Sequence, residues 1–125
     1  MTMTKRVIFL LVIAVFMVSS LAFAGVTMPE QLDEEFTQYP DSSIVTTTNV
    51  PGAIVQAVLD CGDASIDDVY DYYIEKAKDN GWMVQAEDKS ADSYSVLLVK
   101  GTLGGNIVVA LEEDMTSAVV SIMQQ

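Results

Sequence analysis

Residues 65–82 carry the clearest pattern of hydrophobic and polar positions in the chain. Apolar side chains recur there at the three- and four-residue spacing that places them on one side of an α-helix. The residues of this apolar stripe are Ile66, Val69, Tyr70, Tyr73, Ile74 and Ala77. Ser65, followed by Asp68, has the form of a capping box, and Asn80 with Gly81 supplies a stop signal before Trp82. The pattern predicts one amphipathic helix.

The rest of the pattern is typical of β-strands separated by turn residues. Strands are predicted at residues 43–50, 53–61, 82–88, 93–101, 106–114 and 117–125. Pro51 and Gly52 suit a type II turn between the first two, and Gly104 and Gly105 belong to a flexible connection before residue 106. The short connections after residue 82 require antiparallel neighbours. We predict an α+β two-layer sandwich, β-β-α-β-β-β-β, with one helix packed on one face of a largely antiparallel sheet.

The first 24 residues have the organisation of a secretory signal peptide. A basic start with Lys5 and Arg6 precedes an apolar run, and Ala22 and Ala24 form a small-x-small cleavage site. We expect cleavage after Ala24 and a periplasmic or secreted protein. The alternative is an uncleaved anchor, which would be the chain's one attachment to a membrane.

Residues 25–38 form an acidic, weakly patterned segment ahead of a single domain at residues 39–125. A short helical turn is expected after Pro29, with Leu32 and Phe36 on one side. These two residues either pack on the domain edge or dock a partner.

The charge balance excludes several classes of function. Loss of Lys5 and Arg6 with the leader leaves four lysines against 18 acidic residues, a formal charge of −14, with no Arg and no His. Such a chain repels nucleic acids and anionic lipid headgroups. Without His it has no imidazole base, and one Cys without His cannot build a structural zinc site.

A set of residues in the first half of the domain resembles a pattern in known proteins. Tyr39 and Pro40 precede a strand pair, a Ser-x-Asp-Asp-Val-x-x-Tyr-Tyr sequence opens the helix, and Gly81 and Trp82 close it. The helix residues concerned are Ser65, Asp67, Asp68, Val69, Tyr72 and Tyr73. The pattern resembles that of small exported bacterial envelope proteins of unknown function. This resemblance implies an envelope domain, but the chain lacks the cysteine of the lipid-anchored members at its cleavage site.

Cys61 is the first candidate for chemistry, as a buried structural thiol, an intermolecular disulfide or a redox centre. Acidic neighbours in sequence are expected to raise its pKa. The acidic residues Asp60, Asp63, Asp67 and Asp68 suggest a divalent-cation site, but no EF-hand spacing is present, and a solvated helix end explains them better.

Three weaker signals remain. Glu112, Glu113 and Asp114 could pair as acid and base but fall in a turn, and Lys100 precedes Gly101 in the wrong order for a phosphate loop. Tyr72 lies outside the apolar stripe of the predicted helix. An exposed tyrosine at this position either contributes to an interface or has no functional role.

We therefore assign no catalytic, cofactor-binding or metal-ligating residue, and no cofactor. The sequence predicts a non-catalytic binding domain whose partner is an envelope protein or peptide, held by a sheet face or a sheet edge. The alternatives are a thiol-dependent enzyme or redox protein using Cys61, and an acidic divalent-cation binder.

Overall fold

A computed structural model describes residues 27–124 of the 125-residue chain. The expected signal peptide and its cleavage site after Ala24 lie outside the described residues. Within residues 27–124, neither helix is long and apolar enough to cross a membrane.

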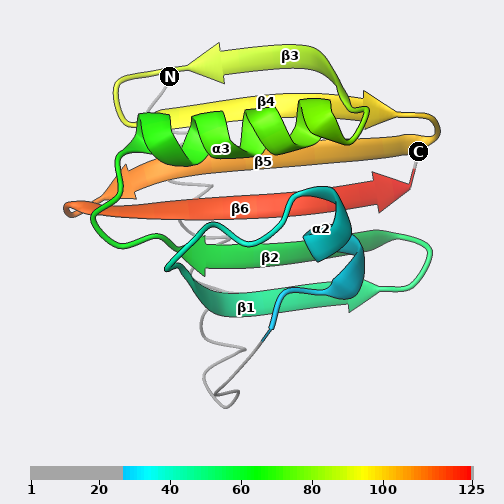
Figure 1. Ribbon diagram of the computed structural model, residues 1–125, viewed down its shortest axis with the longest axis horizontal. Coiled ribbons are helices and arrows are strands. Elements are labelled where there is room, and N and C mark those ends of the chain that lie inside the picture. The colour runs from blue at the N-terminus through cyan, green and yellow to red at the C-terminus, as the bar shows by residue number, and fades with distance from the viewer. Residues whose placement is uncertain (1–26, 125) are drawn as a thin grey trace.

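The described chain is a sheet-dominated α+β fold. Six strands form one antiparallel sheet in the order β1-β2-β6-β5-β4-β3 (Figure 1). The strands are β1 (Ser43–Val50), β2 (Ile54–Asp60), β3 (Met83–Lys89), β4 (Ser93–Lys100), β5 (Leu103–Glu112) and β6 (Met115–Gln124). The predicted order of strands and principal helix along the chain is confirmed. The pairing of β2 with β6, which joins the first hairpin to the C-terminal strands, was not predicted.

Helix α3 (Ile66–Asp79) forms where the periodicity predicted it. Ser65 caps it, since its hydroxyl accepts the Asp68 amide at 3.0 Å. Gly81 has a φ of 87°, a left-handed conformation that glycine adopts without strain, and it ends the helix. The buried residues are Ile66, Val69, Tyr70, Tyr73 and Ala77. The predicted stripe is therefore the face that packs on the sheet, over β4 and β5.

A second helix, α2 (Glu30–Glu35), lies over β2 and β6 (Figure 1). The sequence predicted a short helical turn after Pro29, and a helix forms there, but the predicted architecture counted only one helix and did not include this element. Leu32 and Phe36 are both fully buried in the main core, which also contains residues of α3 and of the central strands. The acidic residues of α2 do not prevent this burial because the two apolar side chains lie four residues apart, on one side of the turn.

The turns follow the expected chemistry at one place and depart from it at another. Gly52 has a φ of 76°, and the Ala53 amide donates to the Val50 carbonyl at 2.9 Å, as a tight turn between β1 and β2 requires. Gly104 and Gly105 are strand residues, so the prediction of a flexible connection there was wrong. A Cβ on Gly105 would lie 3.0 Å from Cζ3 of Trp82. This glycine leaves room for the indole ring.

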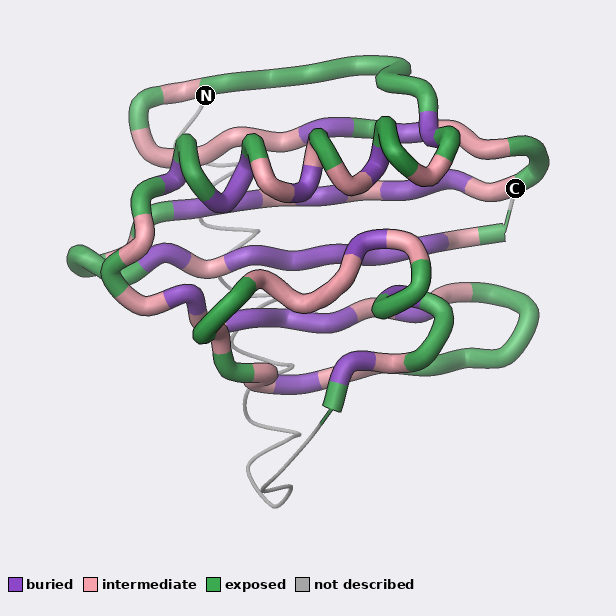
Figure 2. Tube along the Cα trace, viewed as in Figure 1, coloured by how far each residue is buried: buried purple, intermediate pink, exposed green. Residues whose placement is uncertain are grey.

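The cross-strand register separates two kinds of sheet surface. One surface bears the side chains that form the main core with the helices, including Val55, Leu59, Ile107, Val109 and Val120. The alternate positions carry a smaller cluster, in which Val58 and Val119 contact each other and Val45 packs against them. Figure 2 shows burial running along the central strands and exposure along the strand at the β3 edge.

Candidate binding surface

β3 is the most exposed element of the sheet. All seven of its residues are exposed, and the exposed fractions of Met83 and Val84 reach 72% and 43%. Its inner side pairs with β4, while no other strand of the described chain lies along its outer side. An edge strand of this kind presents backbone N–H and C=O groups to a further strand. β3 is therefore the sheet edge best suited to strand addition.

The register divides the side chains of β3 between the two surfaces of the sheet. A bulge separates Val84 from Ala86. Val84 and Glu87 pair with the core residues Leu98 and Val96, so they point toward the helices. Met83, Ala86 and Asp88 occupy the alternate positions. The first half of β3 thus offers uncharged side chains on both surfaces, and the second half is charged.

The charged half of β3 is fastened to α3. The Tyr70 hydroxyl donates a hydrogen bond to the Glu87 carboxylate. Burial, followed by this hydrogen bond, raises the pKa of Tyr70. The Lys89 ammonium lies 5.0 Å from the ring centroids of both Tyr70 and Tyr94. The Tyr94 hydroxyl in turn donates to Asp67 of α3 at 2.8 Å. We call this set, Tyr70, Glu87, Lys89, Tyr94 and Asp67, the α3 clasp.

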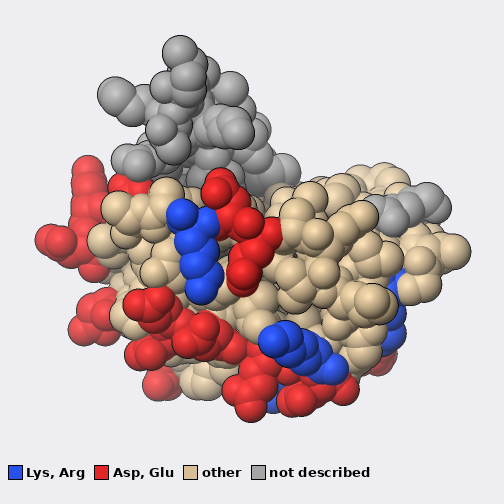
Figure 3. Space-filling model, turned by 90° about the horizontal axis from the view of Figure 1, so that it is seen from above, with Lys and Arg blue, Asp and Glu red and all other residues tan. Residues whose placement is uncertain are grey.

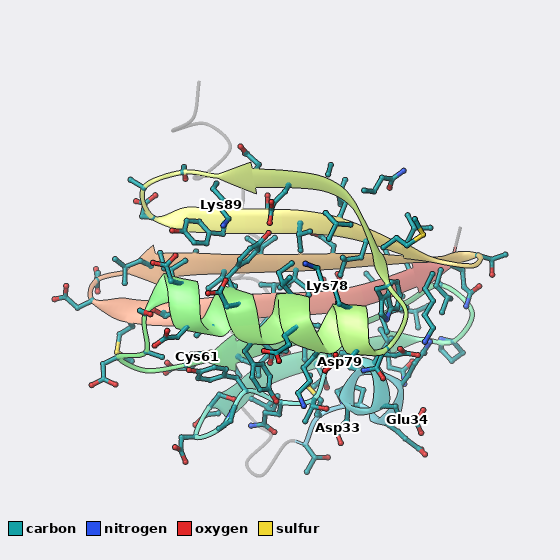
Figure 4. The ribbon with its side chains drawn as sticks, turned by 45° about the horizontal axis from the view of Figure 1, so that its top comes forward. Asp33, Glu34, Cys61, Lys78, Asp79 and Lys89 are labelled. Carbon is teal, nitrogen blue, oxygen red and sulfur yellow. The ribbon has the colours of Figure 1, made fainter. Side chains whose placement is uncertain are left out.

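Figure 4 shows the Lys89 side chain directed inward from β3 rather than along the outer edge. Lysines at exposed edges ordinarily discourage a further strand from pairing. Because Lys89 lies over the two tyrosine rings, its ammonium does not extend along the outer side of β3.

The start of β3 is fixed by a second set of contacts. The Trp82 indole N–H donates to Glu35 at 3.0 Å, and the Lys100 ammonium donates to the same oxygen at 2.8 Å. The Asn80 side-chain amide donates to the Glu35 backbone carbonyl at 2.7 Å. These bonds join α2, the end of α3 and β4 directly before Met83. Lys100 is thus engaged in an ion pair, and the strand glycines do not form a phosphate loop around it.

Charge is unevenly distributed around this edge. Figure 3 looks down onto the β3 side of the molecule and shows acidic side chains gathered at its left end and along its lower rim. The opposite end, where β3 begins in Figure 1, is largely uncharged. The edge therefore runs from an apolar end at Met83 to an acidic end at Glu87 and Asp88.

The neighbouring part of the sheet continues the apolar end. Met83 pairs with Val99, which pairs with Gly104, and Leu97 in the next row is 46% exposed. Because paired residues of antiparallel strands lie on the same surface, these side chains form one uncharged strip beside Met83. A partner side chain placed next to Met83 would extend this row.

The other edge of the sheet, β1, is less exposed. Thr46 is only 3% exposed, and Val45 is half-buried against Val58 and Val119. A bulge interrupts the pairing of β1 with β2 between Ile44 and Thr46. β3 carries a bulge too, so burial distinguishes the two edges: β1 is partly buried, whereas every residue of β3 is exposed.

Cys61 lies at the end of β2 and is 7% exposed. Burial, followed by the Asp60 carboxylate, raises the pKa of its thiol to about 12. The neutral thiol is therefore the form present near pH 7, whereas attack on a substrate requires the thiolate. This geometry does not favour thiol chemistry.

Three of the four acidic residues around the start of α3 have separate structural positions, and the fourth, Asp63, is exposed in the turn before the helix. Asp60 accepts the Gly62 amide at 2.9 Å, Asp67 accepts the Tyr94 hydroxyl, and Asp68 lies in the first turn of α3. Between residues 27 and 124, no group of three or more His, Cys, Asp or Glu side chains is arranged to hold a metal ion.

The remaining candidates also lack an arrangement for chemistry. Glu113 and Asp114 form the β5–β6 turn with φ values of 48° and 69°, and burial raises the pKa of Glu112. Tyr72 is half-buried between the rings of Tyr39 and Tyr73, with centroid distances of 5.2 and 5.1 Å. Its ring serves local packing.

Sequence reasoning identified a sheet edge as a candidate site but did not single out the residues of β3. The sequence feature that could have singled out β3 lies in Met-Val-Gln-Ala-Glu-Asp. This stretch lacks the strict alternation of apolar and polar residues that a strand buried on one face would show. Neither the family models, the curated proteins nor the solved structures that were compared with the chain gave a match.

Proposed function

We propose that this protein is an exported binding domain without catalytic activity. It captures an envelope protein or peptide by adding an extended segment of that partner to the outer side of β3. The observation that carries the proposal is the exposure of all seven residues of β3 along a sheet edge whose two ends are anchored. Main-chain hydrogen bonds would supply affinity, and alternate side chains would supply selectivity.

The proposed architecture is a two-layer sandwich, with α3 as the principal helix on one face of the sheet. In this arrangement the contacts of Glu35 and the α3 clasp hold β3 in a fixed geometry before a partner arrives. A preformed strand loses little conformational entropy on binding, which favours strand addition over the docking of a flexible loop. The leader, with cleavage expected after Ala24, would deliver the domain to the periplasm or the exterior.

A site-specific crosslinking experiment in intact cells tests this function. A photoreactive amino acid replaces Met83 in one variant and Glu34, an exposed residue of α2, in a matched control. We expect a crosslinked partner from position 83 and none from position 34, together with a mature N-terminus at Gly25 by mass spectrometry. Equal crosslinking from both positions, or none from position 83, would contradict the proposal.

A further inference from the structure

The outer side of β3 differs in chemistry from one end to the other. Met83 and Val84 form its apolar end, and Glu87 and Asp88 form its acidic end, three to five residues farther along. A strand added here meets both ends at once, because paired strands run side by side at about 4.8 Å. The two ends therefore select for two kinds of side chain in a fixed order.

We propose that the partner segment is basic at the end beside Glu87 and Asp88 and apolar at the end beside Met83 and Val84, and that it pairs antiparallel to β3. This inference rests on the proposed function and names the class of its ligand. Read from its N-terminus, the segment carries two Lys or Arg residues, then two small polar residues, then two β-branched or other apolar residues.

The register explains this order. Antiparallel pairing places the first basic residue opposite Asp88 and the second opposite Glu87, while a small residue meets Ala86 and the bulge at Gln85. The last two residues lie opposite Val84 and Met83. The residue beside Met83 extends the row that already contains Val99 and Gly104.

Electrostatics disfavours a second copy of this chain as the occupant. Antiparallel pairing of two β3 strands about a two-fold axis would bring Glu87 and Asp88 of each copy onto an edge flanked by the acidic residues of α3. The mature chain would carry a formal charge of −14, so two copies that approach each other through this edge would repel.

The charge pattern also predicts a salt dependence. The added strand gains main-chain hydrogen bonds that salt hardly affects and a Coulomb attraction that salt screens over a Debye length of about 8 Å at 0.15 M. Raising the ionic strength from 0.05 to 0.5 M should lower the binding affinity of a basic segment severalfold and leave the affinity of a neutral segment nearly unchanged.

Synthetic peptides of eight residues test the inference directly. The probe TKKSTVIT carries the proposed pattern, TEESTVIT reverses its charge, and a third version of the probe has N-methyl groups on alternate amides. Binding to the purified protein is measured by calorimetry and by amide hydrogen exchange. We expect the first peptide to bind at least 10-fold more tightly than the second, with new protection confined to residues 83–89, and the methylated peptide not to bind.

A charge-swap variant provides the decisive control. Asp88 is exposed, so Asp88→Lys should leave the fold intact, which the unfolding midpoint verifies. In this variant the preference should shift at least 10-fold toward TEESTVIT. An unchanged preference, equal binding of the two charged peptides, protection on α3 instead of β3, or no binding at millimolar concentration would each overturn the inference. A crosslinked partner from position 83 with an acidic segment would overturn it too, while leaving the proposed function standing.

Discussion

Helix α2 and strand β3 are similar in length but opposite in burial. α2 has six residues, four of them acidic, yet its one apolar residue, Leu32, and the adjoining Phe36 are completely buried. β3 has seven residues, three of them apolar, yet every residue is exposed. The comparison shows that composition does not determine which segment reaches the core. The direction of a few apolar side chains, and the contacts that hold the segment in place, determine it.

The largest expected effect on stability comes from the buried residue that adjoins α2. Phe36 is fully buried, and its ring lies 5.3 Å from that of Trp82. Phe36→Ala should lower the free energy of unfolding by about 3–5 kcal/mol, because it removes an aromatic side chain and leaves a cavity. Urea unfolding measures this loss. A loss below about 1 kcal/mol would mean that α2 is not part of the cooperative core.

The next effect tests whether Trp82 holds the start of β3. Gly105→Ala would place a methyl group 3.0 Å from the indole ring and 3.3 Å from Cβ of Leu98. We expect a loss of about 1–3 kcal/mol from overpacking. Fluorescence of Trp82, which is the chain's one tryptophan, should also shift as the ring moves. Thr102→Ala, at an exposed position in the preceding turn, is the matched control and should change neither signal.

The third prediction is a pH dependence of the free energy of unfolding that arises from the buried thiol of Cys61. Its folded pKa of about 12 exceeds the ordinary value of 9.0, so the native state favours the neutral thiol. The stabilisation is complete below about pH 9 and is lost as the pH rises toward 12, at up to about 1.4 kcal/mol per pH unit. Cys61→Ala lacks this contribution.

Comparison of the two proteins at pH 8 and pH 10 isolates the thiol, since Tyr70 and Tyr73 titrate in both. The wild-type protein should lose about 1 kcal/mol more than Cys61→Ala over this interval. Equal losses would indicate that the thiol is accessible in the native state, and would revive the thiol-dependent alternative.

The sequence predicted the elements that local rules specify. The Ser65 cap, the Gly81 stop and the apolar stripe of α3 depend on spacing within a few residues, and the structure confirms all three. The strands and their antiparallel connections after residue 82 follow from short turns in the same way.

Features that depend on distant contacts could not be read from the sequence. From the sequence, Gly105 is typical of a loop, and only its contact with Trp82 explains why a glycine stands in this strand. The α2 segment is acidic and weakly patterned, and the bonds from Trp82 and Lys100 to Glu35 that hold it in place join residues far apart in the chain. The same limit applies to the candidate site. An edge strand is recognised only once the order of the strands in space is known, and no local pattern specifies that β3 lies at the edge.

The smallest expected effect on stability comes from the exposed strand β3. Met83 is 72% exposed, so Met83→Ser changes the buried apolar area very little. The substitution should change the free energy of unfolding by no more than about 0.5 kcal/mol. The same substitution removes the apolar side chain that the proposed partner strand would contact, and should weaken binding of the TKKSTVIT peptide severalfold. A change in binding without a change in stability would separate the role of β3 from that of α2. A stability loss as large as that of Phe36→Ala would instead show that Met83 belongs to the core, and that the distinction between the two segments is wrong.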